Sequence, residues 1–546
     1  MNPSNVNPFS GKTYGQSVAL LAEQFGQREA LIFQGKRWNF SQVKQEIDRA
    51  SARLASLGLK KQDKVGIWMP NRPEAIWYWL GAAQMGCVAV FFNTRLTQDE
   101  IDYQLRQSDT RAVLVPGPGG FRDFLGDVAK LCPELTTAKP GALRCAAFPE
   151  LRHVISLDKA PANLSGVTDW STPAPADLPI PAIETDIDAP ALIVYSSGTT
   201  ALPKGVVLTQ NVWRKAYDHG PRFGQTIDDK LYLVMPLFGI MSNVNGVLTM
   251  WAHASAIVLD ERFEEEKTLG LIQDEGCSVI YLMPVMLEKM LRHPRFKEFK
   301  LAKLRTGTIV TNDPEVMARA MDELGLHAMY ATYGMSELAS VALRSVPGDS
   351  REVLLHSHGR PMPDIEVRIA DPDTNKSLPV GEIGEMQVRG YSVTPGYYNK
   401  PKETAAATAP NGWFKTGDAG FERPDGNFKF ISRLKDGYKH NGFNVSTLEV
   451  EAVLKRHPAV AAAAVVGIPD PTTGEIGIAF VVPRENATID TAELAAFVHP
   501  LVSNYKRPER IVVLDELPLT AGTGKVQTRQ LKEMAQAMMT KEKKPA

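Results

Sequence analysis

Residues 195–205 read Tyr-Ser-Ser-Gly-Thr-Thr-Ala-Leu-Pro-Lys-Gly and lie between two apolar stretches that are suited to strands. Residues 196–200 are five consecutive small residues, of which four carry hydroxyls. Such a loop can bring backbone N–H groups and hydroxyls close to phosphate oxygens, and Lys204 can add a positive charge. It is not a Walker A loop, because Pro203 and Gly205 stand where that pattern requires glycine before the lysine and a hydroxyl residue after it. A turn rich in small residues can also be an ordinary exposed loop, so the rest of the chain decides its meaning.

The composition excludes several function classes. The chain has 546 residues, more than one hydrophobic core can serve, so we expect at least two domains. A formal net charge of -1 gives no general attraction to nucleic acid or to acidic membranes. The four cysteines are scattered without a CxxC pair, which argues against a zinc site and a disulfide framework. No apolar stretch is long enough to span a bilayer and no signal peptide is visible, so we expect a cytoplasmic protein without a transmembrane segment.

Alternating patterns in the first hundred residues predict an α/β fold. Apolar residues recur at helical spacing through residues 41–57, and Gly58 is a typical C-terminal stop. Residues 65–69 and 87–92 are strand candidates, separated by a helical pattern that begins at Pro73. This alternation implies a largely parallel sheet covered by helices. Residues 115–190 have weaker periodicity, and there we expect long surface connections.

The last hundred residues differ in pattern. The predicted elements are a helix capped by Ser446 and Glu449, strands over 459–468 and 476–482, a helix from about Thr491 and a strand over 511–514. They indicate a small α+β domain, followed by a charged tail over 541–546 that we expect to be disordered. The predicted division is therefore a large α/β domain over 1–432, a hinge over 433–436 and a small mobile domain over 437–546.

The loop at 195–205 resembles the Ser/Thr-Ser-Gly-Thr-Thr-Gly-x-Pro-Lys-Gly signature of adenylate-forming enzymes, with Ala201 in place of a glycine. This superfamily includes acyl-CoA synthetases, the adenylation domains of peptide synthetases and beetle luciferases. Five further segments resemble its motifs and follow in the expected order: Tyr-Gly-Met-Ser-Glu at 333–337, the glycine-rich stretch 381–396, Trp-Phe-Lys-Thr-Gly-Asp at 413–418, Arg-Leu-Lys-Asp at 433–436, and Leu-Pro-Leu-Thr-Ala-Gly-Thr-Gly-Lys at 517–525. The resemblance covers nearly the whole chain and is strongest to acyl-CoA synthetases.

The resemblance implies an ATP site. The residues that it assigns to the phosphate loop are Ser196, Ser197, Gly198, Thr199, Thr200 and Lys204. Tyr333 would lie beside the adenine and Ser336 near the α-phosphate, with Thr332 and Gly334 next to them. Glu337 would hold Mg²⁺, since a hard cation prefers a carboxylate together with the ATP oxygens.

The resemblance also assigns roles in the C-terminal motifs. Asp418 would accept hydrogen bonds from both ribose hydroxyls, and Arg433 would contact ribose or phosphate. Lys525 would be the adenylation lysine, although the chain has one residue more than usual between Pro518 and Lys525. Lys435 would be the hinge about which the small domain turns. The thiol channel formed after that rotation would be lined by Lys439 and Gly442. The implied catalytic residues are Lys204, Ser336, Glu337 and Lys525.

The acyl pocket is expected from positions where the family forms its walls: Phe238, Gly239, Thr306, Gly307 and Ala331. None of these residues is charged, which favours an apolar acid over an amino acid, whose ammonium group would need a carboxylate partner. Fatty, aryl and alicyclic acids all remain open. Gly239 stands where the family often has histidine, so it either widens the pocket or only eases backbone packing.

We therefore expect an acid–thiol ligase that converts a carboxylic acid, ATP and CoA into acyl-CoA, AMP and pyrophosphate, with Mg²⁺ as its cofactor. Its partners would be these small molecules and not nucleic acid, and a homo-oligomer is possible. Three alternatives remain. A stand-alone adenylating enzyme would pass the acyl group to a carrier protein or an amine. A luciferase-like oxygenase would need a special substrate. A regulatory protein would bind nucleotide without turnover.

Overall fold

The protein is described here by a computed structural model. The described residues are 7–175, 177–196, 202–434, 437–440, 443–445, 447–470, 473–502, 504–519 and 526–542. Within these ranges no helix is both long enough and apolar enough to cross a bilayer.

The chain forms two compact units, and each unit is built from separate stretches of sequence. The first unit comprises Met1–Val367 and Val388–Phe414, and the second comprises Arg368–Gln387 and Lys415–Ala546. The chain therefore passes between the units three times, within β18 (Ile365–Ala370), β19 (Gly384–Gly390) and β21 (Trp413–Glu422). The second unit already includes residues 415–434, and the hinge over 433–436 stays a prediction.

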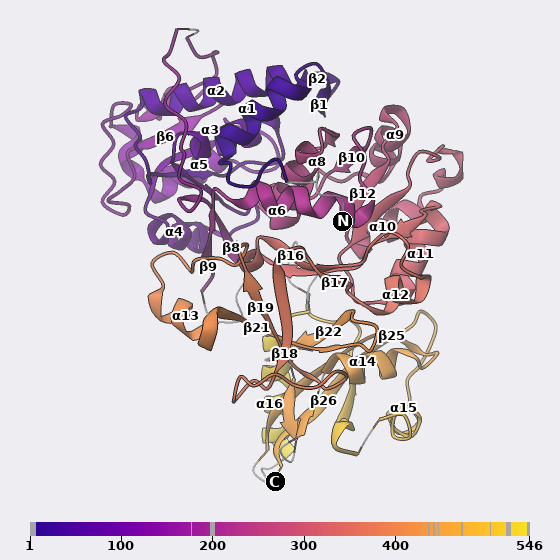
Figure 1. Cartoon of the computed structure of the whole chain (residues 1–546). Coiled ribbons are helices and arrows are strands. Elements are labelled where there is room, and N and C mark those ends of the chain that lie inside the picture. The colour runs from indigo at the N-terminus through magenta and orange to yellow at the C-terminus, as the bar shows by residue number, and fades with distance from the viewer. Residues whose placement is uncertain are drawn as a thin grey trace. The chain divides into compact units, whose positions relative to one another are not determined.

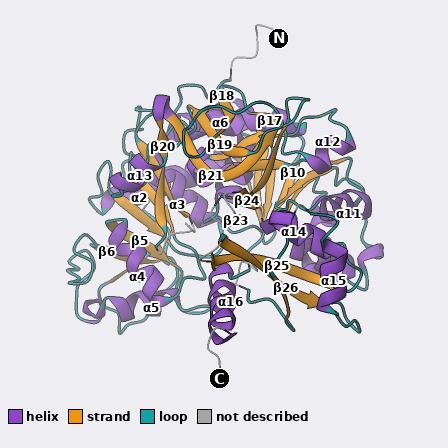
Figure 2. Cartoon of the chain, turned by 90° about the horizontal axis from the view of Figure 1, so that it is seen from below, coloured by secondary structure: helices purple, strands orange, loops and turns teal. Residues whose placement is uncertain are grey.

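The first unit contains a seven-stranded sheet whose strands β8 and β9, at one edge, flank residues 197–201 in the sequence. Its strands, in spatial order, are β7 (Val167–Asp169), β6 (His153–Ser156), β5 (Thr110–Val115), β3 (Lys64–Ile67), β4 (Val88–Phe91), β8 (Pro190–Ser196) and β9 (Lys204–Thr209). All neighbours are parallel except β8 and β9, which form an antiparallel hairpin. Figure 2 shows α4 (Gln98–Gln107) and α5 (Phe124–Leu131) beside β5 and β6.

A second seven-stranded sheet of the same unit carries the candidate pocket residues at 306 and 307. Its strands, in spatial order, are β14 (Ala328–Met329), β13 (Thr306–Ile309), β12 (Val279–Leu282), β10 (Lys230–Leu233), β11 (Ala256–Leu259), β1 (Glu29–Phe33) and β2 (Lys36–Asn39). Only β1 and β2 pair antiparallel. These two mostly parallel sheets, with helices packed on them, confirm the predicted α/β class.

Helices α1 (Tyr14–Phe25), α2 (Phe40–Ser56) and α3 (Pro73–Gln84) lie together at one side of the first unit (Figure 1). Helix α2 begins after Asn39, whose side chain accepts a hydrogen bond from the backbone N–H of Gln42. The residues predicted to face the core are all buried: Val43, Ile47, Ala50 and Leu54. The helical spacing therefore predicted both this helix and its buried face.

The expectation of long surface connections over 115–190 is wrong in part. That stretch holds α5 and the short strands β6 and β7, which extend the first sheet. Leu125, Val128 and Val154 are fully or almost fully buried there. Strands of three or four residues are too short to produce a clear alternating pattern, which explains why the sequence did not reveal them.

The described part of the second unit contains the C-terminal sheet and three α-helices. The strands, in spatial order, are β24 (Phe443–Val445), β23 (Tyr438–His440), β26 (Gly474–Pro483) and β25 (Val460–Asp470), with β27 (Arg510–Val513) beside β26. Helices α14 (Thr447–Lys455) and α16 (Thr528–Glu542) both pack on β25, and α15 (Thr491–Val498) contacts β27 and α14 (Figure 2). Helix α16 runs to residue 542, so the tail predicted to be disordered is helical in its first two residues.

Candidate active site

Strands β8 and β9 flank the predicted phosphate loop and pair with each other as an antiparallel hairpin. Ser196 ends β8 and Lys204 begins β9, and the two residues face each other across the hairpin. The Tyr195 hydroxyl donates to Oε1 of Gln107 over 2.6 Å, which anchors the end of β8. The hairpin confirms that the loop joins two strands, while residues 197–201 themselves lie outside the described ranges.

Glu337 lies in a tight turn between two antiparallel strands. The 3₁₀ turn η5 (Ser336–Leu338) joins β15 (Thr332–Met335) to β16 (Ser340–Arg344). Ala339 and Ser340 follow with φ values of 49° and 90°, which are unfavourable for residues with a side chain. Each such residue stores roughly 1–3 kcal/mol of strain, and strain of this kind concentrates at functional sites. A Cβ on Gly334 would lie 1.7 Å from the Ser340 carbonyl oxygen, so only glycine fits there.

Tyr397 connects Lys204 to Glu337. The Lys204 ammonium lies 4.6 Å from the centroid of the Tyr397 ring, and the Tyr397 hydroxyl donates to Oε1 of Glu337 over 2.9 Å. Glu337 is 4% exposed, so its carboxylate is held in a buried position. The sequence analysis named Lys204 and Glu337 but missed Tyr397. Its position directly after Gly396, in the glycine-rich stretch, was the available signal.

The donor set around Glu337 fits a hard divalent cation. Oε1 accepts the Tyr397 hydroxyl, and no other described residue hydrogen bonds to this carboxylate. One carboxylate oxygen therefore remains for a metal whose other ligands would be phosphate oxygens and water. Mg²⁺ typically binds proteins in this way, through one or two carboxylates and the substrate's phosphates.

The other residues of the Tyr-Gly-Met-Ser-Glu motif are also placed in this unit. Thr332 and Tyr333 lie in β15, opposite Arg344 and Leu343 of β16. Tyr333 is 6% exposed, and Ser336 is half-buried at the start of the 3₁₀ turn. Lys204, Tyr333, Ser336 and Glu337 all belong to the first unit, and their roles stay predictions.

In the second unit, Asp418 and Arg433 face each other on neighbouring strands. Asp418 lies in β21 and is 4% exposed, and Arg433 ends β22 (Phe428–Arg433). Nε of Arg433 lies 3.4 Å from Oδ1 of Asp418. Gly417 precedes Asp418 with φ of 71°, a value that glycine adopts freely. The pair is therefore preformed, with a buried carboxylate and a half-exposed guanidinium.

Several predicted residues lie outside the described part of the chain. They are Ser197, Gly198, Thr199, Thr200, Lys435, Gly442 and Lys525. The backbone of Lys439 lies in β23, opposite Asn444 of β24. The roles of all these residues stay predictions.

The predicted acyl-pocket residues belong to or follow three different elements, namely β13, β14 and the start of the helical segment at α7. Thr306 and Gly307 lie in β13, and Gly307 accepts a hydrogen bond from the N–H of Tyr330, the residue before Ala331. A Cβ on Gly307 would lie 2.2 Å from the carbonyl oxygen of Ile280 in the neighbouring strand β12. Position 307 therefore has room only for glycine. Thr306 and Ala331 are buried.

Gly239 stands in a different environment from Gly307. It precedes the helical segment that begins with α7 (Ile240–Ser242), and its φ of -94° is open to any residue. A Cβ there would meet only the Pro236 carbonyl oxygen, at an ordinary 3.4 Å. Backbone packing therefore does not explain this glycine, which favours the interpretation that it leaves room for a ligand. Phe238 beside it is half-buried against the core.

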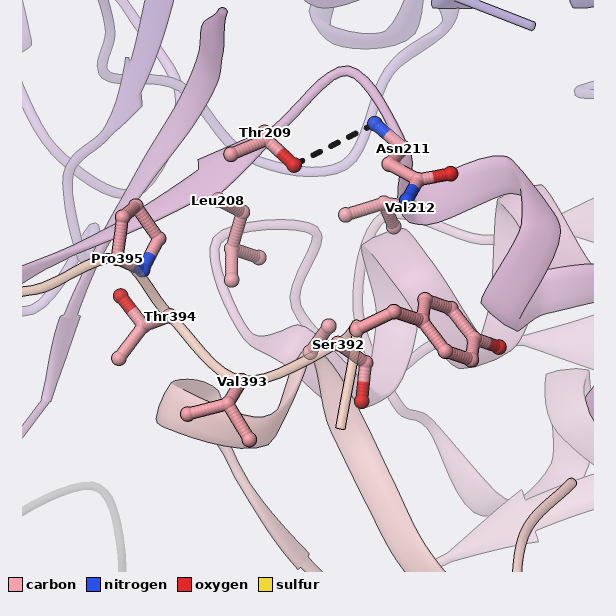
Figure 3. A pocket seen from close by; sticks show the side chains of 10 residues that line it. Leu208, Thr209, Asn211, Val212, Ser392, Val393, Thr394 and Pro395 are labelled. Carbon is pink, nitrogen blue, oxygen red and sulfur yellow. Dashed lines mark hydrogen bonds between the residues drawn. The ribbon is translucent and has the colours of Figure 1, made fainter. Parts of the chain in front are cut away.

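A small cavity lies beside the Glu337 turn. Figure 3 shows Leu208, Val212 and Val393 around it, and Ala339 also contributes to its wall. Its cavity volume is about 10 Å³, which is room for about one water molecule. This cavity cannot hold a nucleotide or an acid. A larger cavity of about 550 Å³ is lined by none of the predicted site residues.

Cys132, Glu134 and Cys145 form a separate cluster, with one ligand atom of each lying within 4.8 Å of the others. Burial raises the pKa of the Cys132 thiol, which opposes the thiolate that a metal would need. Three groups also fall short of the four ligands of a structural zinc site. We assign no metal to this cluster.

The chain is similar to known adenylate-forming enzymes in both sequence and fold. The family model "AMP-binding enzyme" matches residues 19–398, and the model "AMP-binding enzyme C-terminal domain" matches residues 449–525. A putative acyl-CoA synthetase, YngI of Bacillus subtilis (strain 168), is 31% identical over 534 residues, covering 95% of this chain and 96% of the relative. The mitochondrial medium-chain acyl-CoA ligase ACSF2 of Mus musculus is 30% identical, covering 95% and 87%. The solved structure of the amide bond synthetase McbA from Marinactinospora thermotolerans has a TM-score of 0.81 at 25% identity, covering 96% of this chain and 99% of McbA.

Proposed function

We propose that this chain, which belongs to the family of AMP-binding enzymes, joins a carboxylic acid to coenzyme A in two steps through an acyl-adenylate. The observation that carries the proposal is the junction at Tyr397, whose ring contacts the Lys204 ammonium and whose hydroxyl donates to the Glu337 carboxylate. The Lys204 ammonium can bind phosphate oxygens, and the buried Glu337 carboxylate can bind a divalent cation. Together the two groups suit the triphosphate of ATP.

The first step forms the adenylate. A carboxylic acid has a pKa near 4 and is ionised at neutral pH, so its oxygen needs no general base to attack the α-phosphorus. The bond from the α-phosphorus to pyrophosphate breaks, and pyrophosphate leaves. Mg²⁺, held by Glu337, would supply charge neutralisation at the phosphate oxygens. Lys204, Ser336 and Lys525 would hold the phosphates in line and stabilise charge on the α-phosphoryl group.

The second step transfers the acyl group. The thiol sulfur of coenzyme A attacks the acyl carbon, the carbon–oxygen bond to AMP breaks, and the thiol proton passes to solvent. Here Lys525 must leave the site so that the thiol can enter, and Lys435 would be the hinge of that movement. Lys439 and Gly442 would then line the thiol channel. Asp418 and Arg433 would hold the ribose throughout.

The acid would have an apolar body. The proposed wall residues Phe238, Gly239, Thr306, Gly307 and Ala331 carry no charge, and Gly239 leaves space without a backbone need for glycine. Fatty, aryl and alicyclic acids all fit this description. The similarity to acyl-CoA synthetases and ligases supports coenzyme A as the acceptor.

The test is a panel of fatty, aryl, alicyclic and amino acids, each incubated with Mg·ATP, with and without coenzyme A. We expect one acid class to release pyrophosphate and to give a coenzyme A ester by mass spectrometry. Acyl transfer that ignores coenzyme A but proceeds with an amine or a carrier protein would overturn the acceptor assignment. ATP binding without pyrophosphate release from any acid would overturn the proposed reaction.

A further inference from the structure

Helix α4 forms side-chain hydrogen bonds to both sides of the β8–β9 hairpin (Figure 1). The hydroxyl of Tyr103 donates to the carbonyl oxygen of Pro203 over 3.0 Å, and Oε1 of Gln107 accepts the Tyr195 hydroxyl over 2.6 Å. Tyr103 and Gln107 are four positions apart, so they lie on one face of the helix. That face therefore holds the end of β8 and the residue that directly precedes Lys204.

The helix that carries these two side chains is itself well fixed. It begins with a capping box, in which Oε2 of Glu100 accepts the N–H of Thr97 over 2.8 Å. Ile101 and Leu105 are 0% and 3% exposed and belong to the hydrophobic core of this sheet. Because α4 is capped and packed, it can serve as a support for the hairpin.

The backbone is held on both sides of Lys204. The Pro203 carbonyl belongs to the peptide bond that enters Lys204, and it accepts the Tyr103 hydroxyl. One residue after Lys204, the Gly205 carbonyl accepts the N–H of Tyr398 over 2.8 Å. These contacts fix the point of the chain from which the Lys204 side chain extends.

Gln107 connects the hairpin to the Tyr397 junction. While its Oε1 accepts the Tyr195 hydroxyl, its Nε2 donates to the carbonyl oxygen of Tyr398 over 2.6 Å. Tyr398 directly follows Tyr397, whose ring lies against the Lys204 ammonium. A single amide side chain is therefore bonded to the strand that pairs with Lys204 and to the residue next to Tyr397.

The residues just after α4 are tied to the same stretch. Oδ2 of Asp109 accepts the Tyr398 hydroxyl over 2.9 Å and the side-chain amide of Asn399 over 2.9 Å. Asp109 has a φ of 51°, which is unfavourable for a residue with a side chain and persists only where the surroundings hold it. The Lys64 ammonium also lies 4.7 Å from the centroid of the Tyr398 ring. The contact between α4 and the Tyr397 stretch is therefore built from several polar interactions.

Directed hydrogen bonds suit a positioning role better than apolar contacts do. The burial of Ile101 and Leu105 attaches α4 to the core, but apolar burial is non-directional. A hydrogen bond weakens steeply when its angle departs from the ideal, so the Tyr103 and Gln107 bonds also fix orientation. Such precision matters in an active site, where a displacement of about 1 Å can cost about 100-fold in rate.

We infer that Tyr103 and Gln107 are positioning residues for the adenylation step. Tyr103 sets the place of Lys204, and Gln107 sets the places of Lys204 and Tyr397 together. This inference rests on the proposed function, which assigns Lys204 to the phosphates of ATP. Each of the two residues acts through another side chain, so the loss of the Tyr103 hydroxyl should weaken ATP binding only while Lys204 is present.

The first experiment is a double-mutant cycle on the full-length protein. The Kd of Mg·ATP is measured by titration calorimetry, without an acid, for the wild type, Tyr103→Phe, Lys204→Met and the double variant. We expect the Kd to rise by at least ~3-fold in Tyr103→Phe and by at least ~10-fold in Lys204→Met. Once Lys204 is replaced, Tyr103→Phe should add less than ~2-fold, because residues that act as a unit are not additive.

The outcomes separate this inference from the proposed function. A wild-type Kd in Tyr103→Phe, or an equal effect of Tyr103→Phe with and without Lys204, would overturn the inference alone. A wild-type Kd in Lys204→Met would overturn the role of Lys204 in the proposed function, and the inference with it. The matched control is Tyr232→Phe, which loses a buried hydroxyl bond of 3.0 Å to Oδ2 of Asp260 in the same unit. It should lower Tm and leave the Kd unchanged.

The second experiment tests Gln107 through the other side of the junction. Gln107→Met keeps the length of the side chain and removes both hydrogen bonds. With the acid that supports pyrophosphate release, we expect the Mg²⁺ concentration at half-maximal activity to rise by at least ~3-fold, because Tyr397 then holds Glu337 less firmly. Tyr103→Phe should leave this Mg²⁺ concentration unchanged, since Tyr103 contacts only the Lys204 side. An unchanged Mg²⁺ concentration in Gln107→Met would overturn the role of Gln107.

Discussion

The hydroxyl of Tyr397 donates a hydrogen bond to Oε1 of Glu337 over 2.9 Å, although the two residues are 60 positions apart in the chain. The same ring lies under the Lys204 ammonium. One tyrosine thus joins the phosphate-loop hairpin, the Glu337 turn and the glycine-rich stretch. We regard this junction as the fixed part of the proposed nucleotide site, because a buried hydrogen bond and a cation–π contact hold its three residues together.

Replacing Glu337 by Gln should abolish most of the adenylation activity. The amide keeps the shape and can still accept from Tyr397, but it cannot bind a divalent cation as a carboxylate does. We expect kcat/KM for pyrophosphate release to fall by at least ~100-fold, with Tm changed little. Glu23→Gln, at an exposed position, is the matched control and should match the wild type. Full activity in Glu337→Gln would contradict the assignment.

Tyr397→Phe tests the hydrogen bond separately from the ring. The ring and its contact with Lys204 remain, while the Glu337 carboxylate loses the donor that holds it. We expect kcat/KM to fall by roughly 10-fold, because the lost hydrogen bond contributes about 1–2 kcal/mol. The Mg²⁺ concentration at half-maximal activity should rise. Tyr397→Leu, which also removes the ring, should lose more. Wild-type activity in Tyr397→Phe would show that the hydroxyl has no role, and identical activities for the two variants would show that the ring adds nothing.

The two glycines of the proposed acyl pocket should respond differently to a side chain. In Gly239→Phe the new ring can extend into the space that we assign to the acid, so long or wide acids should lose activity while short ones keep it. In Gly307→Ala the new methyl group would meet the Ile280 carbonyl at 2.2 Å, so Tm should fall whatever the acid. Thermal unfolding and an acid-length series measure both effects. A loss of stability in Gly239→Phe without a change in acid preference would place the pocket elsewhere.

Lys215 should make stability depend on pH. Burial lowers the pKa of Lys215 to about 7 from an ordinary 10.5. Below pH 7 both the folded and unfolded chains hold the proton, and between pH 7 and 10.5 only the unfolded chain does, so this residue makes stability rise with pH in that window. Lys215→Met removes the buried charge and should therefore raise the free energy of unfolding at pH 6.5 by an amount on the order of a few kcal/mol, which raises Tm. At pH 10 the same substitution should change Tm much less. The same Tm difference at both pH values would show that Lys215 is not a buried titrating group.

The sequence predicted the elements with clear periodicity and the residues that stand within continuous motifs. Helix α2 followed from apolar spacing, and Lys204 and Glu337 followed from short patterns whose residue types match their chemistry. Such features depend on neighbouring residues alone, so they are visible in one chain.

Most of the features that the sequence did not reveal depend on contacts between residues far apart in the chain. Tyr397 matters because β9 and the Glu337 turn meet at its ring, and no local pattern encodes that meeting. Tyr103 and Gln107 read as ordinary polar positions of a helix, and only the packing of α4 beside β8 and β9 brings them to Pro203 and Tyr195. Strands β6 and β7 were missed for a different reason, since they are too short to show alternation.

The most direct test of the account is acid-dependent exchange of labelled pyrophosphate into ATP, measured without coenzyme A. The account predicts exchange when the correct acid and Mg²⁺ are present, because adenylate formation is reversible and precedes the thiol step. Glu337→Gln should lose this exchange. Coenzyme A ester formation by the wild-type protein with no pyrophosphate exchange in the absence of coenzyme A would contradict the acyl-adenylate as the intermediate.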